Sequence, residues 1–141
     1  MNKIIIALLT VVCAVFGINA IRHDIRFQDI DKFLISSEKF KQQIENGKTD
    51  TILVDVRTIE EYLDGHIGGA ILIDFNKADF KKKIDTLDKE KVYYIYCRSG
   101  GRSGNSRILM NEIGIKDVYD LQGGILAWKA MKHPVKKGVK K

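Results

Sequence analysis

The octapeptide Tyr96-Cys97-Arg98-Ser99-Gly100-Gly101-Arg102-Ser103 joins an apolar run to a segment with a helical pattern. The run before it, 92–96, has the aromatic and β-branched character of a buried strand. A cysteine therefore stands at the end of a predicted strand, with small and cationic residues after it and a helix behind them. This order of elements is suited to holding a sulfur anion.

The chemistry of this stretch follows from its backbone and its charges. Two glycines allow φ values that other residues resist, so successive N–H groups can point inward around an anion. The start of the next helix adds partial positive charge, and two arginines add whole charges. Each feature lowers a thiol pKa, so we predict Cys97 as the nucleophile. The predicted substrate-binding residues are Arg98, Ser99, Gly100, Gly101 and Arg102.

The rest of the chain alternates apolar runs with segments of helical spacing. A short first strand is expected within 21–35, and Ser36 or Ser37 is expected to cap the helix after it. Strands that alternate with short helices indicate an α/β domain with a parallel sheet covered on both faces. Ligands bind at the carboxyl ends of the strands in such sheets, which is where Cys97 is placed. The later strands are predicted at 51–56, 70–73, 92–96 and 118–121.

The N-terminus has the layout of an export signal. A basic start precedes the apolar run 4–16, and small residues then offer cleavage after Ala20. We therefore expect 1–20 to be a signal peptide and the mature chain to begin at Ile21. An uncleaved membrane anchor is the alternative, because 4–21 reaches the lower limit for spanning a bilayer. Both alternatives place the domain outside the cytoplasm, with membrane contact only through this segment.

The composition fits one globular domain. The chain has 141 residues and a formal net charge of +6. We divide the exported part into a domain, 21–133, and a basic tail, 134–141, because Pro134 ends the last helix and lysines dominate the residues after it. Such a charge run is usually solvated, and no aromatic residues interleave with it, so nucleic-acid binding is not expected. Cleavage removes Cys13, which leaves Cys97 without a partner for an intrachain disulfide.

Five motifs stand along the chain in a characteristic order: Asp55-Val56-Arg57, Glu60-Glu61-Tyr62, Gly65-His66-Ile67 with Gly69-Ala70, the cysteine loop, and Gly123-Gly124 with Trp128. From Phe27 to Met131 the chain resembles the rhodanese domain, and it looks like a small, exported, single-domain rhodanese of the phage-shock type. The resemblance implies a three-layer α/β fold, with helices on both faces of a parallel sheet, and a periplasmic location. One departure is Gly68, where the family often has proline.

The resemblance also implies an activity, that of a thiosulfate:cyanide-type sulfurtransferase. A Cys97 thiolate takes a sulfane sulfur from a small anionic donor, becomes a persulfide, and passes the sulfur to cyanide or a thiol. The residues agree, because Arg98 and Arg102 can attract the anionic donor and inward N–H groups can stabilise the persulfide. No cofactor is implied, and a monomer is expected.

Several residues are expected to support the loop rather than to react. Asp55 and Arg57 are expected to form an ion pair and hydrogen bonds near it, and Ser103 closes the motif. His66 is interpreted as a structural histidine in a turn, because no positioned acid–base partner is evident. Trp128 is interpreted as a core residue.

Two other functions stay open at this point. A cysteine phosphatase also pairs a cysteine loop with an arginine, but its loop holds one residue more than the four between Cys97 and Arg102. The shorter loop favours a sulfur atom over a phosphate as cargo. A persulfide carrier, or a binding module for a sulfur or redox partner protein, would use the same loop without turnover. No metal site is predicted, because cysteine and histidine show no ligand spacing.

Overall fold

The computed structural model describes residues 32–47 and 50–138, which belong almost entirely to the unit Phe33–Lys141. The predicted signal peptide, its cleavage site and Cys13 lie outside the described residues. Within the described ranges, no helix combines the length and the hydrophobicity needed to cross a membrane.

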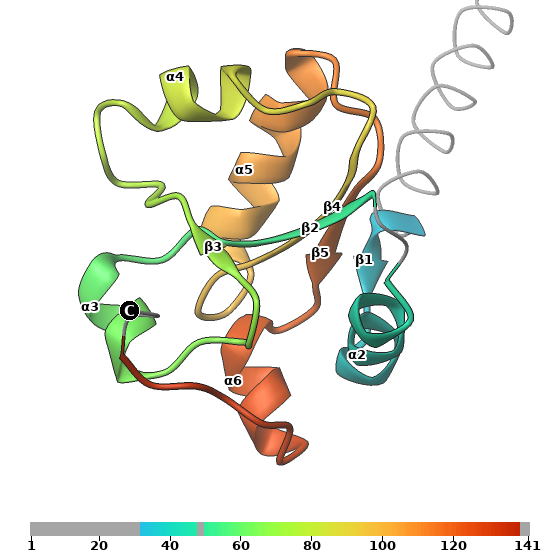
Figure 1. Ribbon diagram of the computed structural model, residues 1–141, viewed down its shortest axis with the longest axis vertical. Helices are drawn as coiled ribbons and strands as arrows, with labels where there is room; N and C mark the ends of the chain where they lie inside the picture. Colours follow the sequence, from blue (N-terminus) through green and yellow to red (C-terminus); the bar gives the residue numbers. More distant parts are fainter. Residues whose placement is uncertain (1–31, 48–49, 139–141) are drawn as a thin grey trace, which may run out of the picture. The chain divides into compact units, whose positions relative to one another are not determined.

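The unit is built on a five-stranded parallel sheet with the strand order β1-β5-β4-β2-β3 (Figure 1). The strands are β1 (Leu34–Ile35), β2 (Thr51–Asp55), β3 (Ile71–Leu72), β4 (Val92–Tyr96) and β5 (Val118–Leu121). The predicted parallel sheet is confirmed, and β4 and β5 have the predicted bounds. Because β4 lies in the middle of the sheet, the cysteine that follows it is flanked by the ends of β2 and β5.

Helices cover both faces of the sheet, as the three-layer prediction requires. The helices α4 (Phe80–Asp85) and α5 (Gly101–Glu112) pack on one face, and α2 (Ser37–Glu45) and α6 (Gly124–Ala130) pack on the other. The side chains of β4 alternate between them, since successive residues of a strand point to opposite faces. Tyr93, Ile95 and Cys97 join the core under α5, whereas Tyr94 and Tyr96 join the core under α2 and α6.

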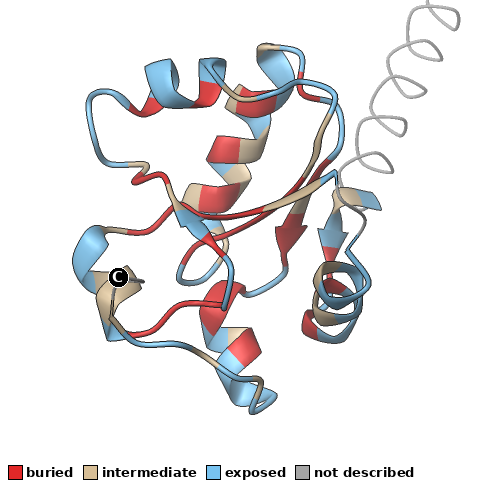
Figure 2. Cartoon of the chain, in the orientation of Figure 1, coloured by how far each residue is buried: buried red, intermediate tan, exposed pale blue. Residues whose placement is uncertain are grey.

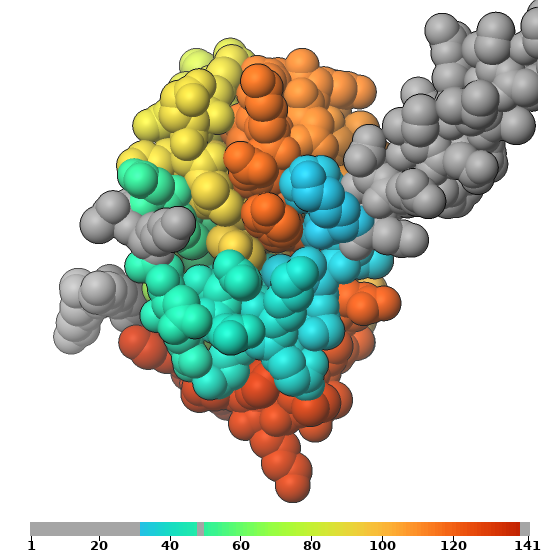
Figure 3. Space-filling view, turned by 90° about the vertical axis from the view of Figure 1, so that its right-hand side faces the viewer, coloured from blue at the N-terminus to red at the C-terminus, as the bar shows by residue number. Residues whose placement is uncertain are grey.

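Burial follows this arrangement. Figure 2 shows most of β2, β4 and β5 as buried, whereas the edge strand β3 and the outer surfaces of the helices are largely exposed. In Figure 3, β1 and α2 form a cyan and teal band across one face of the unit. Phe40 of α2 packs edge-on against Tyr94 and Trp128 beneath that band, with ring centroids 5.5 and 6.3 Å away. Trp128 is a core residue, as predicted, and is 2% exposed.

Local sequence fixes the helix starts. Ser36 caps α2 by accepting a hydrogen bond from the Lys39 N–H, which settles the choice between Ser36 and Ser37. The short α3 (Ile59–Asp64) follows β2 and begins with a capping box. In it, Thr58 accepts a hydrogen bond from the Glu61 N–H while the Glu61 carboxylate accepts one from the Thr58 N–H.

The segment 134–138 is attached to the domain through its backbone, while the side chains of Lys136 and Lys137 are exposed. Lys136 and His66 exchange two backbone hydrogen bonds of 2.8 Å, and the Gly138 N–H donates to the Leu63 carbonyl at 3.0 Å. The Trp128 indole donates to the carbonyl of Pro134 at 2.9 Å. Backbone pairing thus attaches this segment to the domain, which a count of charges does not reveal.

Candidate active site

Cys97 follows β4 directly and lies between the sheet and the start of α5. Cys97 is 1% exposed. The Gly100 N–H donates a hydrogen bond to its sulfur at 3.1 Å, and the Ser103 hydroxyl donates another at 3.4 Å. Ser103, which the sequence suggests only as a support, therefore contacts the sulfur directly.

The loop can turn its N–H groups toward the sulfur because of one glycine. Gly100 is the N-cap of α5 and has a φ of 111°, a value that favours glycine. A Cβ at this position would meet nothing within 4 Å, so backbone conformation rather than space requires the glycine. Gly101 is exposed and begins α5, whose N-terminal N–H groups add partial positive charge near Cys97.

These donors outweigh the cost of burying the sulfur. Burial opposes ionisation of Cys97, but hydrogen bonds from the Ser103 hydroxyl and from the N–H groups of Ser103, Gly100 and Ser99 lower the thiol pKa overall. A lowered pKa increases the fraction of thiolate, which is the reactive form of cysteine.

The N-terminus of α6 holds the loop from behind through backbone contacts. The Ile125 N–H donates to the Cys97 carbonyl at 2.9 Å, and the Leu126 N–H donates to the Arg98 carbonyl at 3.2 Å. Gly124 has a φ of 59°, and a Cβ there would lie 2.5 Å from the Arg98 oxygen. Gly124, which the sequence predicts only as part of a turn, is thus required for this close approach.

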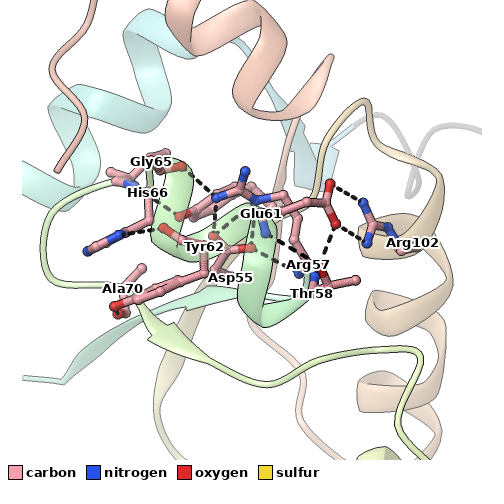
Figure 4. A network of polar contacts seen from close by, with 11 residues as sticks. Asp55, Arg57, Thr58, Glu61, Tyr62, Gly65, His66, Ala70 and Arg102 are labelled. Atoms are coloured by element: carbon pink, nitrogen blue, oxygen red, sulfur yellow. Dashed lines mark hydrogen bonds and ion pairs between the residues drawn. The ribbon is translucent and has the colours of Figure 1, made fainter. Parts of the chain in front are cut away.

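The Arg102 guanidinium forms an ion pair with the Glu61 carboxylate. It makes two hydrogen bonds of 2.7 and 2.8 Å to that carboxylate, which ties α5 to α3 (Figure 4). The hydrogen bond from Arg102 lowers the Glu61 pKa to about 2, although partial burial opposes the shift. Glu61 belongs to one of the five motifs, but its role as the partner of Arg102 is not evident from the sequence.

Asp55 and Arg57 form the ion pair that the sequence predicts, at the end of β2 (Figure 4). The Asp55 carboxylate accepts from the Arg57 N–H, Nε and Nη2 at 2.6–3.1 Å. Arg57 also donates to the Gly65 carbonyl at 2.8 Å and lies over the Tyr96 ring, 5.5 Å from its centroid. Since Tyr96 immediately precedes Cys97, this pair steadies the strand end that carries the sulfur.

Comparisons with known proteins agree with this geometry. A family model described as the rhodanese-like domain matches residues 36–131. This chain belongs to the rhodanese family. A sulfurtransferase of Allochromatium vinosum is 32% identical over 101 residues, which are 72% of this chain and 92% of that relative. The thiosulfate sulfurtransferase GlpE of Coxiella burnetii is 36% identical over 87 residues, which are 62% of this chain and 78% of that relative.

A solved structure shows the same fold. The rhodanese-related protein of Thermoplasma volcanium matches with a TM-score of 0.64 and 25% identity, covering 73% of this chain and 96% of that one. The names of the relatives support a role for this rhodanese domain in the transfer or carriage of sulfur.

Two of the predicted substrate-binding residues of the cysteine loop, Arg98 and Ser99, lie at the surface. Arg98 forms no ion pair with any residue in the described part of the chain, whereas Arg102 is paired. His66 is buried, stacks on the Tyr62 ring with a 3.8 Å centroid distance, and has Nδ1 3.0 Å from the Tyr62 carbonyl, as expected of a structural histidine.

Two surface hollows of this rhodanese domain lie elsewhere. One of about 450 Å³ is lined by Ile44, Leu53, Trp128 and neighbouring residues, and one of about 610 Å³ by Tyr62, His66, Ile71 and neighbouring residues. Neither is lined by the loop 97–103. The site is therefore assigned from the chemistry around Cys97 and not from a hollow.

One buried residue near the loop is absent from the sequence-based prediction. Asp120 is 2% exposed and lies on β5, the strand beside β4. Burial raises its pKa to about 6, with hydrogen bonding from Ser103 as the largest opposing influence. The available signal was a carboxylate within the otherwise apolar and aromatic stretch 118–121.

Proposed function

We propose that this rhodanese domain is a thiosulfate-type sulfurtransferase that works through a persulfide on Cys97. The observation that carries the proposal is the set of donors around the sulfur, namely the Gly100 N–H at 3.1 Å and the Ser103 hydroxyl at 3.4 Å. They favour the thiolate over the thiol, and a persulfide needs the same kind of stabilisation because it is also an anion. The name of the GlpE relative supports thiosulfate as the donor.

The reaction balances in two displacements. The Cys97 thiolate attacks the outer sulfur of thiosulfate, the sulfur–sulfur bond of thiosulfate breaks, and sulfite leaves with the bonding electron pair. Cyanide or a thiolate then attacks the outer sulfur of the persulfide. The bonding pair returns to Cys97, which releases thiocyanate or a persulfide of the acceptor. No general base is required, since the nucleophile is already deprotonated.

The two arginines have different parts in this proposal. Arg98 is exposed and makes no ion pair within the described residues, so its charge is available to attract a doubly charged donor. Arg102 is neutralised by Glu61 and instead fixes the start of α5, where N–H groups face the sulfur. In this proposal Arg98 alone attracts the donor, whereas the sequence led us to expect that both arginines bind it.

The test is a sulfur adduct. Incubation of the full chain with thiosulfate should add about 32 Da, the mass of one sulfur on the nucleophile. Peptide mapping then places the sulfur on Cys97 rather than Cys13, and cyanide should remove it as thiocyanate. Cys97→Ser is the matched control, because serine is nearly isosteric and a poor nucleophile. An unmodified Cys97 after incubation, or retained transfer in Cys97→Ser, would overturn the proposal.

The same experiment separates the alternatives. A persulfide carrier forms the adduct but turns over cyanide slowly and yields its sulfur faster to a protein thiol. A cysteine phosphatase hydrolyses an aryl phosphate without any adduct. The engagement of Arg102 by Glu61 supports sulfur transfer over phosphate chemistry, since that arginine is not directed at an oxyanion.

We also propose that the protein acts outside the cytoplasm, in the periplasm, as a monomer on small sulfur donors and acceptors. The layout of residues 1–20 supports export. The intact mass of the exported protein tests it, because cleavage after Ala20 gives a chain that begins at Ile21, whereas an anchored protein keeps Met1.

A further inference from the structure

The larger of the two hollows lies beside β3, the strand at the edge of the sheet. Its volume of about 610 Å³ is within the range of clefts that hold ligands. It is lined by the stretch 69–72, by the segment 136–138, and by Tyr62 and His66. Since no residue of the cysteine loop lines it, the proposed sulfur transfer does not explain it.

β3 presents an unpaired stretch of backbone at this hollow. Within the described sheet, β3 pairs only with β2. The Ile73 N–H donates to the Asp55 carbonyl of β2, so the N–H and carbonyl of the preceding Leu72 point away from β2. Neither Leu72 group has a hydrogen-bond partner within 32–47 and 50–138. The Ala70 carbonyl at the same edge is already occupied, because the Tyr62 hydroxyl donates to it at 2.8 Å.

The hollow is also positively charged. Lys136 and Lys137 line it and are exposed, and neither forms an ion pair with a residue that the structure describes. None of the described residues that line the hollow carries a carboxylate. Backbone hydrogen bonds to His66 and Leu63 fix the segment that bears the two lysines. Two uncompensated ammonium groups beside unpaired backbone favour a partner that carries carboxylates.

Gly68 allows Lys136 to lie at this place. A Cβ at position 68 would be 2.9 Å from Lys136 Cε and 3.5 Å from its Nζ, so the lysine side chain lies over the turn before β3. The proline that the family often has at this position would displace it. Lys136 and Gly69 also line the smaller hollow, so the two hollows adjoin along this turn.

Protection of the edge against pairing is the usual reason for lysines beside an edge strand. In that arrangement the strand is short and the lysines belong to the strand itself. Here the lysines belong to a different segment, and a hollow is lined by both that segment and β3. Ile71 of β3 is 44% exposed and leaves an apolar side chain at the edge. These features suit a strand edge that receives a partner.

We propose that the edge groove, defined as β3 together with the segment 136–138, binds an extended acidic segment of a partner protein. The partner adds a strand beside β3, its backbone pairs with the Leu72 N–H and carbonyl, and its carboxylates contact Lys136 and Lys137. An anionic lipid surface would meet the two lysines but would leave the Leu72 backbone unpaired, so the unpaired edge favours a polypeptide. The proposal goes beyond sulfur transfer, because the edge groove contains no residue of the cysteine loop.

The experiment measures the binding of a labelled, end-blocked peptide of alternating glutamate and valine to the full chain. In an extended peptide this alternation places the carboxylates on one face and the apolar side chains on the other. The peptide should bind saturably. A peptide with lysine in place of glutamate should bind at least about tenfold more weakly, because like charges then meet. Methylation of alternate peptide nitrogens removes backbone donors and should weaken binding by about fivefold or more.

Variants of the chain locate the binding. Lys136→Gln combined with Lys137→Gln should weaken binding of the acidic peptide by about fivefold, since each exposed ion pair contributes modestly. Lys81→Gln combined with Lys82→Gln removes the same charge from α4, which does not line the groove, and should leave binding nearly unchanged. Added salt should weaken binding to the wild-type chain more than binding to the variant without Lys136 and Lys137.

The strand pairing has a readout of its own. When the acidic peptide is bound, the Leu72 amide hydrogen should become protected from exchange with solvent, as followed by NMR. The Ile73 amide already donates to Asp55 and should change little. This measurement uses the wild-type chain and so does not depend on the folding of a variant.

Four results would overturn the inference. They are a failure of the acidic peptide to bind saturably, equal binding of the lysine peptide, an equal loss in the α4 control, and a bound peptide that leaves Leu72 unprotected. Binding of phosphatidylglycerol vesicles that depends on Lys136 and Lys137, without peptide binding, would assign the groove to a membrane surface instead. None of these measurements uses Cys97, so the sulfur adduct and the edge groove can fail separately.

Discussion

The two strands that flank the cysteine strand each bury an aspartate, and the two aspartates are treated in opposite ways. Asp55 ends β2 beside Tyr96, and Asp120 lies on β5 beside Ile95. Both are almost fully buried. Asp55 accepts hydrogen bonds from the backbone and side chain of Arg57, whereas Asp120 leaves one oxygen without a partner in the described residues.

The difference distinguishes a structural aspartate, Asp55, from an aspartate that lies on the face of the reactive cysteine, Asp120. Asp55 points away from the face of the sheet that α5 covers. Leu53, two residues earlier on β2 and therefore on the same face as Asp55, packs under α2 and α6. The pair of Asp55 with Arg57 steadies the end of the sheet. Asp120 points to the face of Cys97, where an incompletely satisfied acid can exchange a proton or a hydrogen bond.

The largest effect is expected from breaking the satisfied pair. Asp55→Ala leaves the Arg57 guanidinium buried without its counter-ion, so the free energy of unfolding should fall by about 3–5 kcal/mol. Urea denaturation measures it. Replacing both residues, as Asp55→Leu with Arg57→Met, should cost less than the single change, because no charge is then left buried. A loss below about 1 kcal/mol for Asp55→Ala would mean that this pair is not the scaffold.

A second effect tests the backbone support that comes after β5. Gly124→Ala places a Cβ 2.5 Å from the Arg98 oxygen at a φ of 59°. The strain and the clash should lower the free energy of unfolding by about 3 kcal/mol, or displace the loop and abolish sulfur transfer. Gly69→Ala is the matched control, since Gly69 also has a positive φ, 90°, but a Cβ there meets nothing within 4 Å. It should cost only about 1 kcal/mol, and equal losses would show that space does not matter.

The third prediction sharpens the contrast by removing the unsatisfied acid. The pKa of Asp120 is raised on folding from 3.8 to about 6, so the folded state binds its proton more tightly. That contribution favours folding below the unfolded value and is lost as the pH rises through 6. Asp120→Asn should therefore stabilise the protein at neutral pH by about 1–2 kcal/mol. Denaturation at several pH values should also show less loss of stability between pH 4 and 6 in the variant; destabilisation at pH 7 would contradict the prediction.

The contrast between the two aspartates also shows what the sequence could predict. The bounds of β4 and β5, the cysteine loop and the Asp55–Arg57 pair follow from patterns that are local or two residues apart. The partner of Arg102 lies 41 residues away, on a different helix. Asp120 likewise comes beside the cysteine strand only when β5 is placed next to β4. Such pairs depend on the strand order, which hydrophobic patterns do not contain.

The attachment of 134–138 was hidden for a related reason. Its lysines match a solvated tail, but the contact with His66 is made by the backbone, and backbone hydrogen bonds leave no trace in side-chain composition. Gly124 had a visible signal, since paired glycines mark a turn. The further role of Gly124, its close approach to the Arg98 carbonyl, can be recognised only once the position of the loop is known.

The smallest effect is expected at Glu61, the third acidic residue near the loop. Its carboxylate is paired, as that of Asp55 is, but it is less buried than either aspartate. The pair with Arg102 is partly open to solvent, with side-chain exposures of 23% for Arg102 and 28% for Glu61. Because solvent screens such a pair, Glu61→Gln should cost only about 1 kcal/mol at neutral pH. The variant should, however, raise the Michaelis constant for thiosulfate less than Arg98→Gln does, if Arg98 is the residue that attracts the donor.

The contribution of Glu61 to stability changes with pH in the direction opposite to that of Asp120. The Glu61 pKa is lowered on folding from 4.5 to about 2, so its contribution is complete above pH 4.5 and is lost as the pH falls through 2. Acid denaturation should therefore weaken the wild-type protein more than Glu61→Gln, and the two curves should converge at low pH. Parallel curves across this range would show that Arg102 is held by its packing and not by the carboxylate. In that case the start of α5 would owe its position to the backbone contacts of Cys97 and Arg98 with α6.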